Sequence, residues 1–236
     1  KNSKHVILAG DDDQAIYGWA GADVQRFQEE PAKDIVLPQS YRVPQAVQQI
    51  ADQILNRIPD DRRIKKQWAP RPETGNVDHI TSIEDAPLHQ SDWLILARTN
   101  DKLIKLKSIL RDIPIYFEIK GRKSYKTRLY TAIKNYTRWT KGDKLSLSEC
   151  KDLFEYLELD QELKEERMYD LQEFGYKTTD EWYEVFKSDP EECLYIREML
   201  RSGEKLDNPA RVKLSTIHAA KGGEATNVLI ILDNTK

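Results

Sequence analysis

The stretch that most constrains the fold lies near the N-terminus, where residues 6–22 read VILAGDDDQAIYGWAGA. It opens with four apolar residues closed by Gly10, a pattern typical of a buried strand that stops abruptly. Three aspartates and Gln14 follow at the point where this strand would meet a loop. Because ligands bind at this carboxyl edge in open α/β sheets, the pattern predicts a ligand site here.

The side chains that follow suit a site for phosphates and bases. The amide of Gln14 can hold a phosphate oxygen or orient a water, and Tyr17 and Trp19 supply aromatic faces on which bases can stack. An acidic, solvated turn would account for the aspartates taken alone. The whole arrangement favours a site that couples a phosphate to stacked bases.

Residues 10–22 resemble motif III of the superfamily 1 DNA helicases of the UvrD, Rep and PcrA family, whose pattern is Gly-Asp-x-x-Gln-x-Ile-Tyr-x-aromatic-x-Gly-Ala. Every fixed position is matched. The resemblance implies that Gln14 reports the γ-phosphate of ATP and that Tyr17 and Trp19 contact DNA. Ala20 stands where the family commonly has arginine, which removes one cation near the DNA bases.

Residues 37–42, LPQSYR, resemble motif IV of the same helicases, Leu-x-x-x-Tyr-Arg. The resemblance implies that Tyr41 stacks on the adenine of ATP and that Arg42 reaches its γ-phosphate as an arginine finger. These residue types suit that chemistry, because a ring face can hold a base and a planar cation can balance the charge that develops in phosphoryl transfer. The basic residues between Arg57 and Lys66 are read as a solvated loop in preference to a phosphate-binding patch.

Residues 93–100, WLILARTN, resemble the strand and Arg-Thr-Asn turn that these helicases place beside the DNA strand. By that resemblance Arg98 and Asn100 are candidate contacts to phosphate or sugar.

Residues 216–224, TIHAAKGGE, resemble motif V, Thr-x-His-x-x-Lys-Gly-x-Glu. The resemblance implies that Thr216 and His218 contact DNA phosphates and that Glu224 approaches the nucleotide. A histidine after a strand, taken alone, would be read as a structural residue. Gly223 stands where the family commonly has leucine.

Apolar runs and helical periodicity alternate along the chain, which predicts an α/β fold. Strands or extended segments are expected at residues 6–9, 35–37, 77–83, 93–97, 114–121, 212–216 and 228–232. Helices are expected at residues 24–30, from Pro44 to Ile58 with Val47, Ile50 and Ile54 on one face, and where Leu103, Leu106 and Leu110 share a buried face. This alternation predicts a RecA-like parallel sheet of the P-loop NTPase type.

Residues 120–141 contain eight basic residues and no acidic one, with four aromatic residues between them. Two interpretations stay open. The stretch could form an electrostatic footprint for DNA, or it could be a solvated helix whose aromatic residues belong to the core.

Residues 143–192 are strongly acidic and carry helix start signals at Ser146 with Glu149, Thr178 with Glu181, and Asp189 with Pro190. Apolar residues at helical spacing predict a small all-helical insertion. In the resembled family a helical domain called 2B is inserted at this point of the second motor domain, and the insertion here is much shorter.

The resemblance divides the chain into three parts. Residues 1–34 would end the first RecA-like motor domain, residues 35–123 and 207–236 would form the second, and residues 124–206 would be a reduced 2B-like insertion. The sequence has no Gly-x-x-x-x-Gly-Lys-Ser/Thr loop to cradle phosphates. We therefore expect a piece of a longer protein that is inactive alone, with motif VI, the Mg²⁺ ligands and most of the N-terminal motor domain outside it.

Composition excludes several classes of protein and kinds of site. The formal net charge of -3 argues against a nucleic-acid binder that uses its whole surface, so DNA contacts must be local. The two cysteines form no C-x-x-C pair, so neither a disulfide framework nor a zinc site is expected. No apolar run approaches the ~18 residues of a membrane helix. A cytoplasmic, DNA-associated protein is expected.

Taken together, these resemblances imply part of an ATP-dependent DNA helicase that moves 3′ to 5′ on single-stranded DNA, using ATP and Mg²⁺. One alternative is a nonenzymatic module with the helicase fold that binds single-stranded DNA or a protein. Another is the helicase half of a helicase-nuclease such as RecB or AddA.

Overall fold

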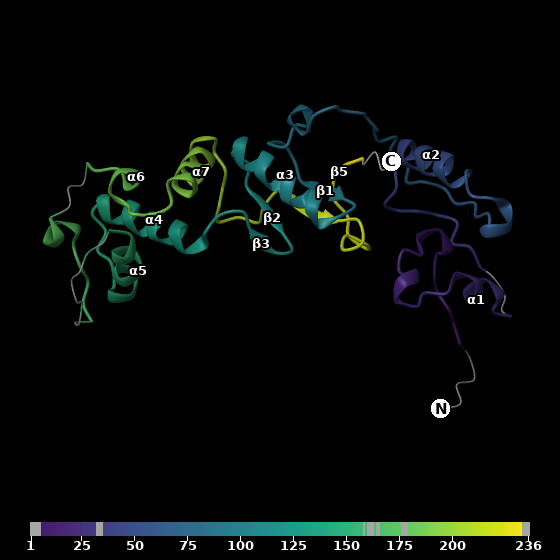
Figure 1. Cartoon of the computed structure of the whole chain (residues 1–236), viewed down its shortest axis with the longest axis horizontal. Helices are drawn as coiled ribbons and strands as arrows, with labels where there is room; N and C mark the ends of the chain where they lie inside the picture. The colour runs from purple at the N-terminus through teal and green to yellow at the C-terminus, as the bar shows by residue number, and fades with distance from the viewer. Residues whose placement is uncertain are drawn as a thin grey trace. The chain divides into compact units, whose positions relative to one another are not determined.

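The computed structural model describes residues 6–31, 35–157, 159, 163, 166–175 and 179–232. The chain forms two compact units, an N-terminal unit of residues 1–83 and a sheet unit of residues 84–236 (Figure 1). None of the helices in the described part of the chain is long and apolar enough to cross a membrane.

The sheet unit is built on a five-stranded sheet with the strand order β3-β2-β4-β1-β5. The strands are β1 (Trp93–Ala97), β2 (Phe117–Ile119), β3 (Arg122–Lys123), β4 (Val212–Thr216) and β5 (Asn227–Ile230). β2, β4, β1 and β5 run parallel, whereas β3 is antiparallel to β2. The sheet is therefore mixed, which corrects the purely parallel sheet expected from the sequence.

The antiparallel edge has a local cause. Ile119 pairs with Arg122, so Lys120 and Gly121 form a two-residue hairpin loop. Both loop residues have positive φ, 51° and 74°, as a tight hairpin turn requires. Glycine adopts this conformation without strain, which is why the chain reverses here.

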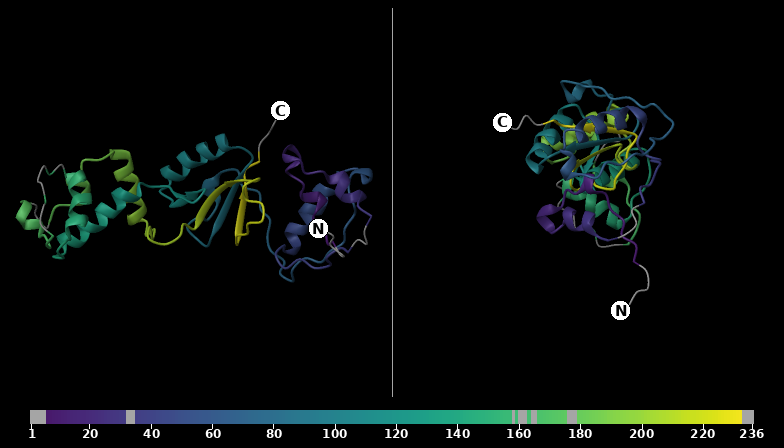
Figure 2. Two further views of the ribbon diagram at one scale, coloured as in Figure 1. Left: turned by 90° about the horizontal axis from the view of Figure 1, so that it is seen from below. Right: turned by 90° about the vertical axis from the view of Figure 1, so that its right-hand side faces the viewer.

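The core of the sheet unit confirms the expected strands and helix. Helix α3 (Asn100–Asp112) covers one face of the sheet (Figure 2). Its buried residues are those predicted from their spacing: Leu103, Leu106 and Leu110. Helix α3 contacts β1, where Ile95 and Ala97 are fully buried. The expected strand at residues 228–232 is β5, which begins one residue earlier and ends at Ile230.

The predicted insertion, residues 124–206, contains helices, as expected. Its helices are α4 (Thr127–Thr140), α5 (Leu147–Leu157), α6 (Trp182–Val185) and α7 (Pro190–Arg201), with a 3-10 turn η5 (Leu171–Phe174). Glu149 accepts hydrogen bonds from the backbone N–H (2.9 Å) and hydroxyl (3.0 Å) of Ser146, which confirms that start signal. Asp189 caps α7. Thr178 lies outside the described residues, and α6 begins after Glu181.

A polar network ties this insertion to the sheet. Glu192 of α7 is 5% exposed and receives hydrogen bonds from the Arg111 guanidinium of α3 and from the backbone N–H of Lys126, at 2.8 and 2.7 Å. Arg111 also lies over the ring of Tyr195, 4.1 Å from its centroid. The hydroxyl of Tyr195 donates to the carbonyl oxygen of Ile115 at 2.6 Å. Sheet and insertion are therefore joined through nearly buried side chains.

The N-terminal unit is organised differently. It contains helices α1 (Val24–Glu29) and α2 (Gln45–Leu55), with 3-10 turns η1 (Asp12–Gln14), η2 (Gly18–Ala20) and η3 (Asp60–Arg62). A further 3-10 turn, η4 (Ile83–Asp85), lies where the two units meet in the sequence. Pro44 is the N-cap of α2, and the helix ends before Ile58.

The strands expected at residues 6–9, 35–37 and 77–83 are wrong for this structure. Among the described residues of the N-terminal unit no strand forms, and the only bridge joins Gln39 to Ala69. The apolar side chains of the first two segments are exposed, as Ile7 at 93% and Leu37 at 79% illustrate. A strand needs a neighbour for its backbone hydrogen bonds, and the described part of this unit supplies none.

Candidate nucleotide-binding and DNA-binding residues

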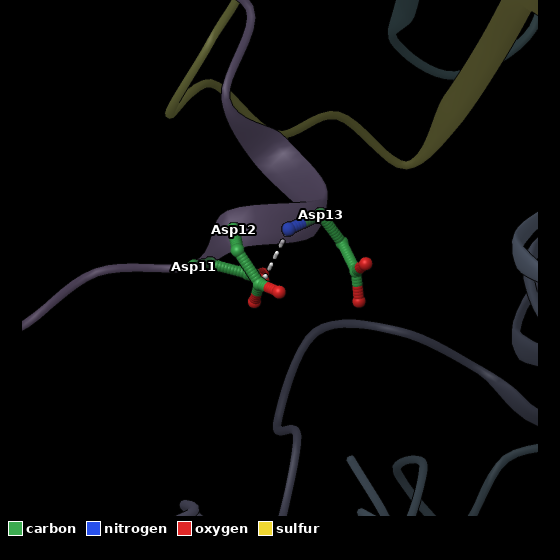
Figure 3. A group of neighbouring side chains, drawn as sticks. All are labelled: Asp11, Asp12 and Asp13. Atoms are coloured by element: carbon green, nitrogen blue, oxygen red, sulfur yellow. Dashed lines mark hydrogen bonds between the residues drawn. The ribbon is translucent and has the colours of Figure 1, made fainter. Parts of the chain in front are cut away.

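The residues of the predicted motif III form a tight turn at the start of the N-terminal unit. Asp11 caps the 3-10 turn η1, and its carboxylate accepts the backbone N–H of Asp13 at 3.2 Å (Figure 3). The carboxylates of Asp11, Asp12 and Asp13 lie within 4.8 Å of one another. Three like charges this close need cations nearby, because their mutual repulsion would otherwise oppose the turn.

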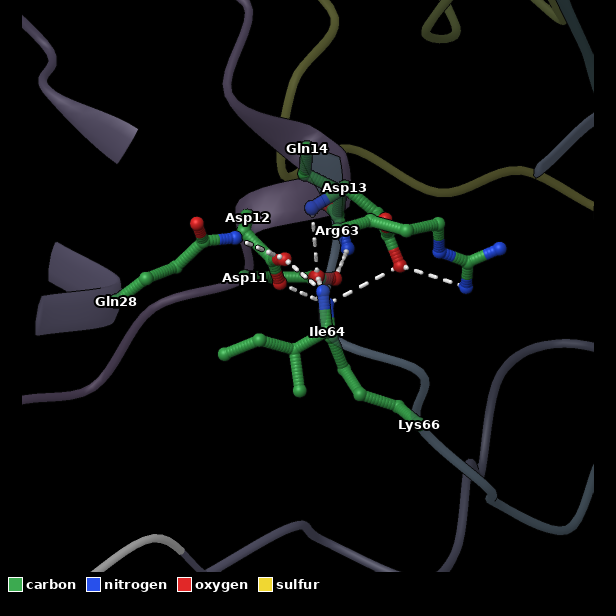
Figure 4. A network of polar contacts seen from close by, with 8 residues as sticks. All are labelled: Asp11, Asp12, Asp13, Gln14, Gln28, Arg63, Ile64 and Lys66. Atoms are coloured by element: carbon green, nitrogen blue, oxygen red, sulfur yellow. Dashed lines mark hydrogen bonds and ion pairs between the residues drawn. The ribbon is translucent and has the colours of Figure 1, made fainter. Parts of the chain in front are cut away.

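Two basic residues from later in the chain supply those cations (Figure 4). The ammonium of Lys66 lies 2.6 Å from Asp11 and 3.1 Å from Asp13, and it also pairs with Asp12. The guanidinium of Arg63 lies 3.4 Å from Asp13. Sequence reasoning missed both residues as partners of this turn, since the basic run appeared to be a solvated loop. Three consecutive aspartates indicate that a counter-charge is needed, but the sequence does not say which segment supplies it.

The charges of this cluster stabilise one another. Burial acts to raise the pKa of Asp12, but hydrogen bonds from Lys66, the Ile64 N–H and Gln28 lower it to about 2. Burial acts to lower the pKa of Lys66, yet hydrogen bonds to the three aspartates raise it well above its usual value. Asp12 and Lys66 therefore both stay ionised across the neutral pH range.

Gln14 and Tyr17 follow on the same turn. Gln14 is exposed, and its side-chain amide donates to Asp11. Tyr17 is half-buried, and the backbone of Trp19 lies in η2, but the side chain of Trp19 is outside the described part. A Cβ at Gly10 would lie 2.9 Å from the tip of the exposed Phe27 ring, so a larger residue there would displace that ring. The turn thus brings Gln14 and the start of the aromatic segment together.

The predicted motif IV residues sit on a second turn of this unit. The hydroxyl of Ser40 accepts the backbone N–H groups of Arg42 and Val43, at 3.3 and 3.2 Å. The amide of Gln39 donates to the carbonyl oxygens of Ala69 and Pro70. These bonds hold the backbone while the side chains project outward, with Tyr41 85% exposed and Arg42 also exposed. An aromatic face and a guanidinium are thus adjacent and accessible.

The sheet unit brings four predicted DNA contacts to one edge. β1 and β4 are parallel neighbours in which Ala97 pairs with Thr216, and the N–H of Ile217 donates to the carbonyl oxygen of Ala97 at 3.0 Å. Arg98 and Asn100 follow β1 directly, and His218 follows β4. Arg98, Asn100 and His218 are exposed, while Thr216 is half-buried and its hydroxyl accepts the N–H of Ala219.

This edge also holds the N-terminus of α3, which begins at Asn100. Its N-cap residue, Thr99, makes no side-chain capping hydrogen bond. The N–H groups of the first turn and the helix dipole at such an end favour an anion. Together with the guanidinium of Arg98, they make this edge suitable for a phosphate.

Glu224 lies away from that edge. Two residues after it, the N–H of Thr226 donates to the carboxylate of Asp92 at 2.9 Å, just before β1 begins. Hydrogen bonds from the Thr226 side chain and from this N–H lower the pKa of Asp92. The segment from Thr216 to Thr226 therefore runs from the carboxyl ends of the strands to their amino ends. The structure separates Glu224 from Thr216 and His218.

The basic stretch at residues 120–141 matches the interpretation as a solvated helix whose aromatic residues belong to the core. Its aromatic residues are buried: Tyr125, Tyr130, Tyr136 and Trp139. Arg128 pairs with Glu155 at 2.7 Å, Lys134 with Asp207 at 2.7 Å, and Arg138 with Glu149 at 2.7 Å. Acidic residues from elsewhere in the sheet unit thus balance much of its charge, and it is not an open cationic surface.

Comparisons with known proteins point to one family. Residues 1–33 match the family model for the UvrD/REP helicase N-terminal domain. The ATP-dependent DNA helicase PcrA of Staphylococcus epidermidis is 27% identical over 158 residues, which cover 57% of this chain and 21% of the relative. PcrA of Leuconostoc citreum is 27% identical over 154 residues, covering 54% and 20%.

The chain spans about a fifth of the length of these relatives. No solved structure matches it significantly. The two kinds of match support a relationship to the UvrD/PcrA helicases, a family of DNA-binding, ATP-binding hydrolases.

Proposed function

We propose that this chain is part of an ATP-dependent DNA helicase that translocates 3′ to 5′ on single-stranded DNA in the cytoplasm. The observation that carries the proposal is the sheet edge at the carboxyl ends of β1 and β4. Arg98 and Asn100 follow β1, Thr216 ends β4 and His218 follows it. An exposed cation, an amide and an imidazole beside an uncapped helix N-terminus suit the phosphates of a DNA strand.

The nucleotide roles follow the resemblance. Tyr41 would stack on adenine, Arg42 would balance charge on the γ-phosphate, Gln14 would sense that phosphate and Glu224 would approach the nucleotide. The exposure of Tyr41 and Arg42 supports these roles, because neither is committed to a core. ATP would bind with Mg²⁺, whose charge assists phosphoryl transfer. The residues described here would supply no ligand to that ion.

The intact protein would also supply a partner for the N-terminal unit. Of the residues between 6 and 82 whose side chains the structure describes, none is buried. The apolar face of α2 is open, with Val47, Ile50 and Ile54 exposed. Apolar surface of this extent favours association. We assign residues 1–34 to the end of a first motor domain, residues 35–123 and 207–236 to a second, and residues 124–206 to a reduced insertion.

The gene sequence on either side of this chain tests the proposal. We expect a Gly-x-x-x-x-Gly-Lys-Thr loop and an Asp-Glu pair upstream, and a further arginine motif downstream. Without them Gln14, Arg42 and Glu224 would have no triphosphate to serve. The proposal would then give way to a nonenzymatic binding module.

The DNA edge gives a prediction of its own. Arg98→Ala should weaken binding of the intact protein to single-stranded DNA by about 5- to 30-fold at low salt, because one phosphate contact is lost. The slope of log affinity against log salt should fall by roughly one unit. Fluorescence anisotropy with a labelled oligonucleotide measures both quantities.

A matched control is Lys105→Ala, which removes an exposed cation from the same unit in the middle of α3. This variant should keep its affinity within about twofold of the wild type. Equal losses in both variants would mean that only overall charge matters, and the specific edge would not be a DNA site.

A further inference from the structure

The three-aspartate turn and the loop after α2 are joined across about fifty residues of sequence. Besides its ion pairs to Lys66 and Arg63, the turn receives the backbone N–H of Ile64, which donates to Asp12 at 3.2 Å. Gln28 donates to the same carboxylate at 2.9 Å. Figure 4 shows these groups converging on one side of the turn.

The side chains of this cluster are well enclosed within the N-terminal unit. The side chains of Asp12, Arg63 and Lys66 are 4%, 9% and 19% exposed, whereas no described apolar residue between positions 6 and 82 is buried. Lys65, the preceding residue in the sequence, has a side chain that is 66% exposed, and it pairs with the exposed Asp60. Charge pairing, more than apolar packing, therefore holds the turn in its conformation.

The position of Gln14 depends on this pairing. Gln14 is the last residue of η1, and its amide donates to Asp11, whose carboxylate is held by Lys66. Loss of the ammonium would leave Asp11 and Asp12 without the Lys66 cation, with the Arg63 guanidinium still at Asp13, and repulsion among the carboxylates would release the turn. Such a release would move the Gln14 amide without removing any group that touches the nucleotide.

We propose that Lys66 is a positioning residue that fixes the Asp11–Asp13 turn and thereby orients Gln14 toward the γ-phosphate. The inference rests on the proposed ATPase function. It adds a link between the Asp11–Asp13 turn of motif III and the loop that follows α2. A substitution in either segment would therefore change the conformation of the other.

The first arm of the test measures the contact itself in the full chain. Acetylation by an amine-reactive ester at pH 8, followed by mass spectrometry, should modify Lys66 at least tenfold more slowly than Lys65. Asp12→Asn should raise the rate at Lys66 at least threefold and leave Lys65 unchanged. Equal rates at the two lysines in the wild type would overturn the proposal.

The second arm measures ATP hydrolysis by the intact protein. Lys66→Met should lower kcat by about 10- to 100-fold with the KM for ATP within about threefold, since the catalytic groups remain but are misplaced. Lys66→Arg should stay within about threefold of the wild type, and the control Lys65→Met within about twofold. An unchanged kcat in Lys66→Met would overturn the positioning role.

A folding defect is separated from a positioning defect by the charge-swapped pair Asp11→Lys with Lys66→Glu. Asp11 is the least enclosed member of the triad, at 39% side-chain exposure, so it tolerates a longer side chain. The double variant should have a kcat at least tenfold higher than that of Lys66→Glu alone. A kcat no higher than that of Lys66→Glu would overturn the proposal. A wild type that protects Lys66 but hydrolyses no ATP would instead refute the proposed function.

Discussion

Replacing Arg42 with alanine is expected to lower the kcat for DNA-stimulated ATP hydrolysis by the intact protein about 10³-fold, the lower end of the range for an arginine finger. The side chain is exposed. The turn that carries it is held by hydrogen bonds that the Ser40 hydroxyl accepts from the backbone N–H groups of Arg42 and Val43. The fold should therefore survive the substitution, and the affinity for single-stranded DNA should change by less than about twofold. Steady-state kinetics and anisotropy together check both statements.

Two companion variants sharpen this result. Arg42→Lys should recover only a small part of the loss, because an ammonium lacks the planar fork of donors. Arg62→Ala removes an exposed arginine from η3 of the same unit and should leave kcat within about twofold. If Arg42→Ala retained a kcat within tenfold of the wild type, Arg42 would not be the finger.

Replacing Glu192 with alanine is expected to have the largest effect on stability. The substitution leaves Arg111 and the Lys126 N–H without their acceptor in a nearly buried setting. Breaking a buried ion pair lowers the free energy of unfolding by about 3–5 kcal/mol. Because the Arg111 side chain is 23% exposed, we expect this substitution to lower it by about 2–3 kcal/mol. For a unit of this size the melting temperature should fall by roughly 4–12 °C.

Thermal unfolding of the full chain, followed by tryptophan fluorescence, checks this prediction. Glu191→Ala is the matched control, because Glu191 is the adjacent, exposed residue of the same helix. It should shift the transition by no more than about 2 °C. Equal shifts in the two variants would show that the network does not join the insertion to the sheet.

Some of the fold follows from local patterns alone. The spacing of Leu103, Leu106 and Leu110 predicts the buried face of α3, and the apolar run at residues 93–97 predicts β1, because each pattern finds its partners within the same unit. The runs at residues 6–9 and 35–37 carry a similar apolar signal but form no strand here. An apolar run predicts burial without naming the segment that will cover it.

The candidate site is likewise predicted from the sequence only in part. Parallel order brings Arg98, Asn100, Thr216 and His218 to one sheet edge, as a strand-by-strand interpretation of the sequence allows. The partners in the ion pairs could not be predicted, because they lie far apart in the sequence. Lys134 pairs with Asp207, 73 residues away, and Lys66 pairs with Asp11, 55 residues away. Local charge runs therefore mislead where the counter-charge comes from a distant segment.

The measurement that tests the central claim most directly is strand separation by the intact protein on two duplexes that differ only in the polarity of their single-stranded tail. The account predicts that ATP with Mg²⁺ supports unwinding of the duplex with a 3′ tail, and that neither the 5′-tailed duplex nor a nonhydrolysable ATP analogue supports it. Unwinding of the 5′-tailed duplex alone, or DNA binding with no ATP-dependent strand separation on either substrate, would contradict it.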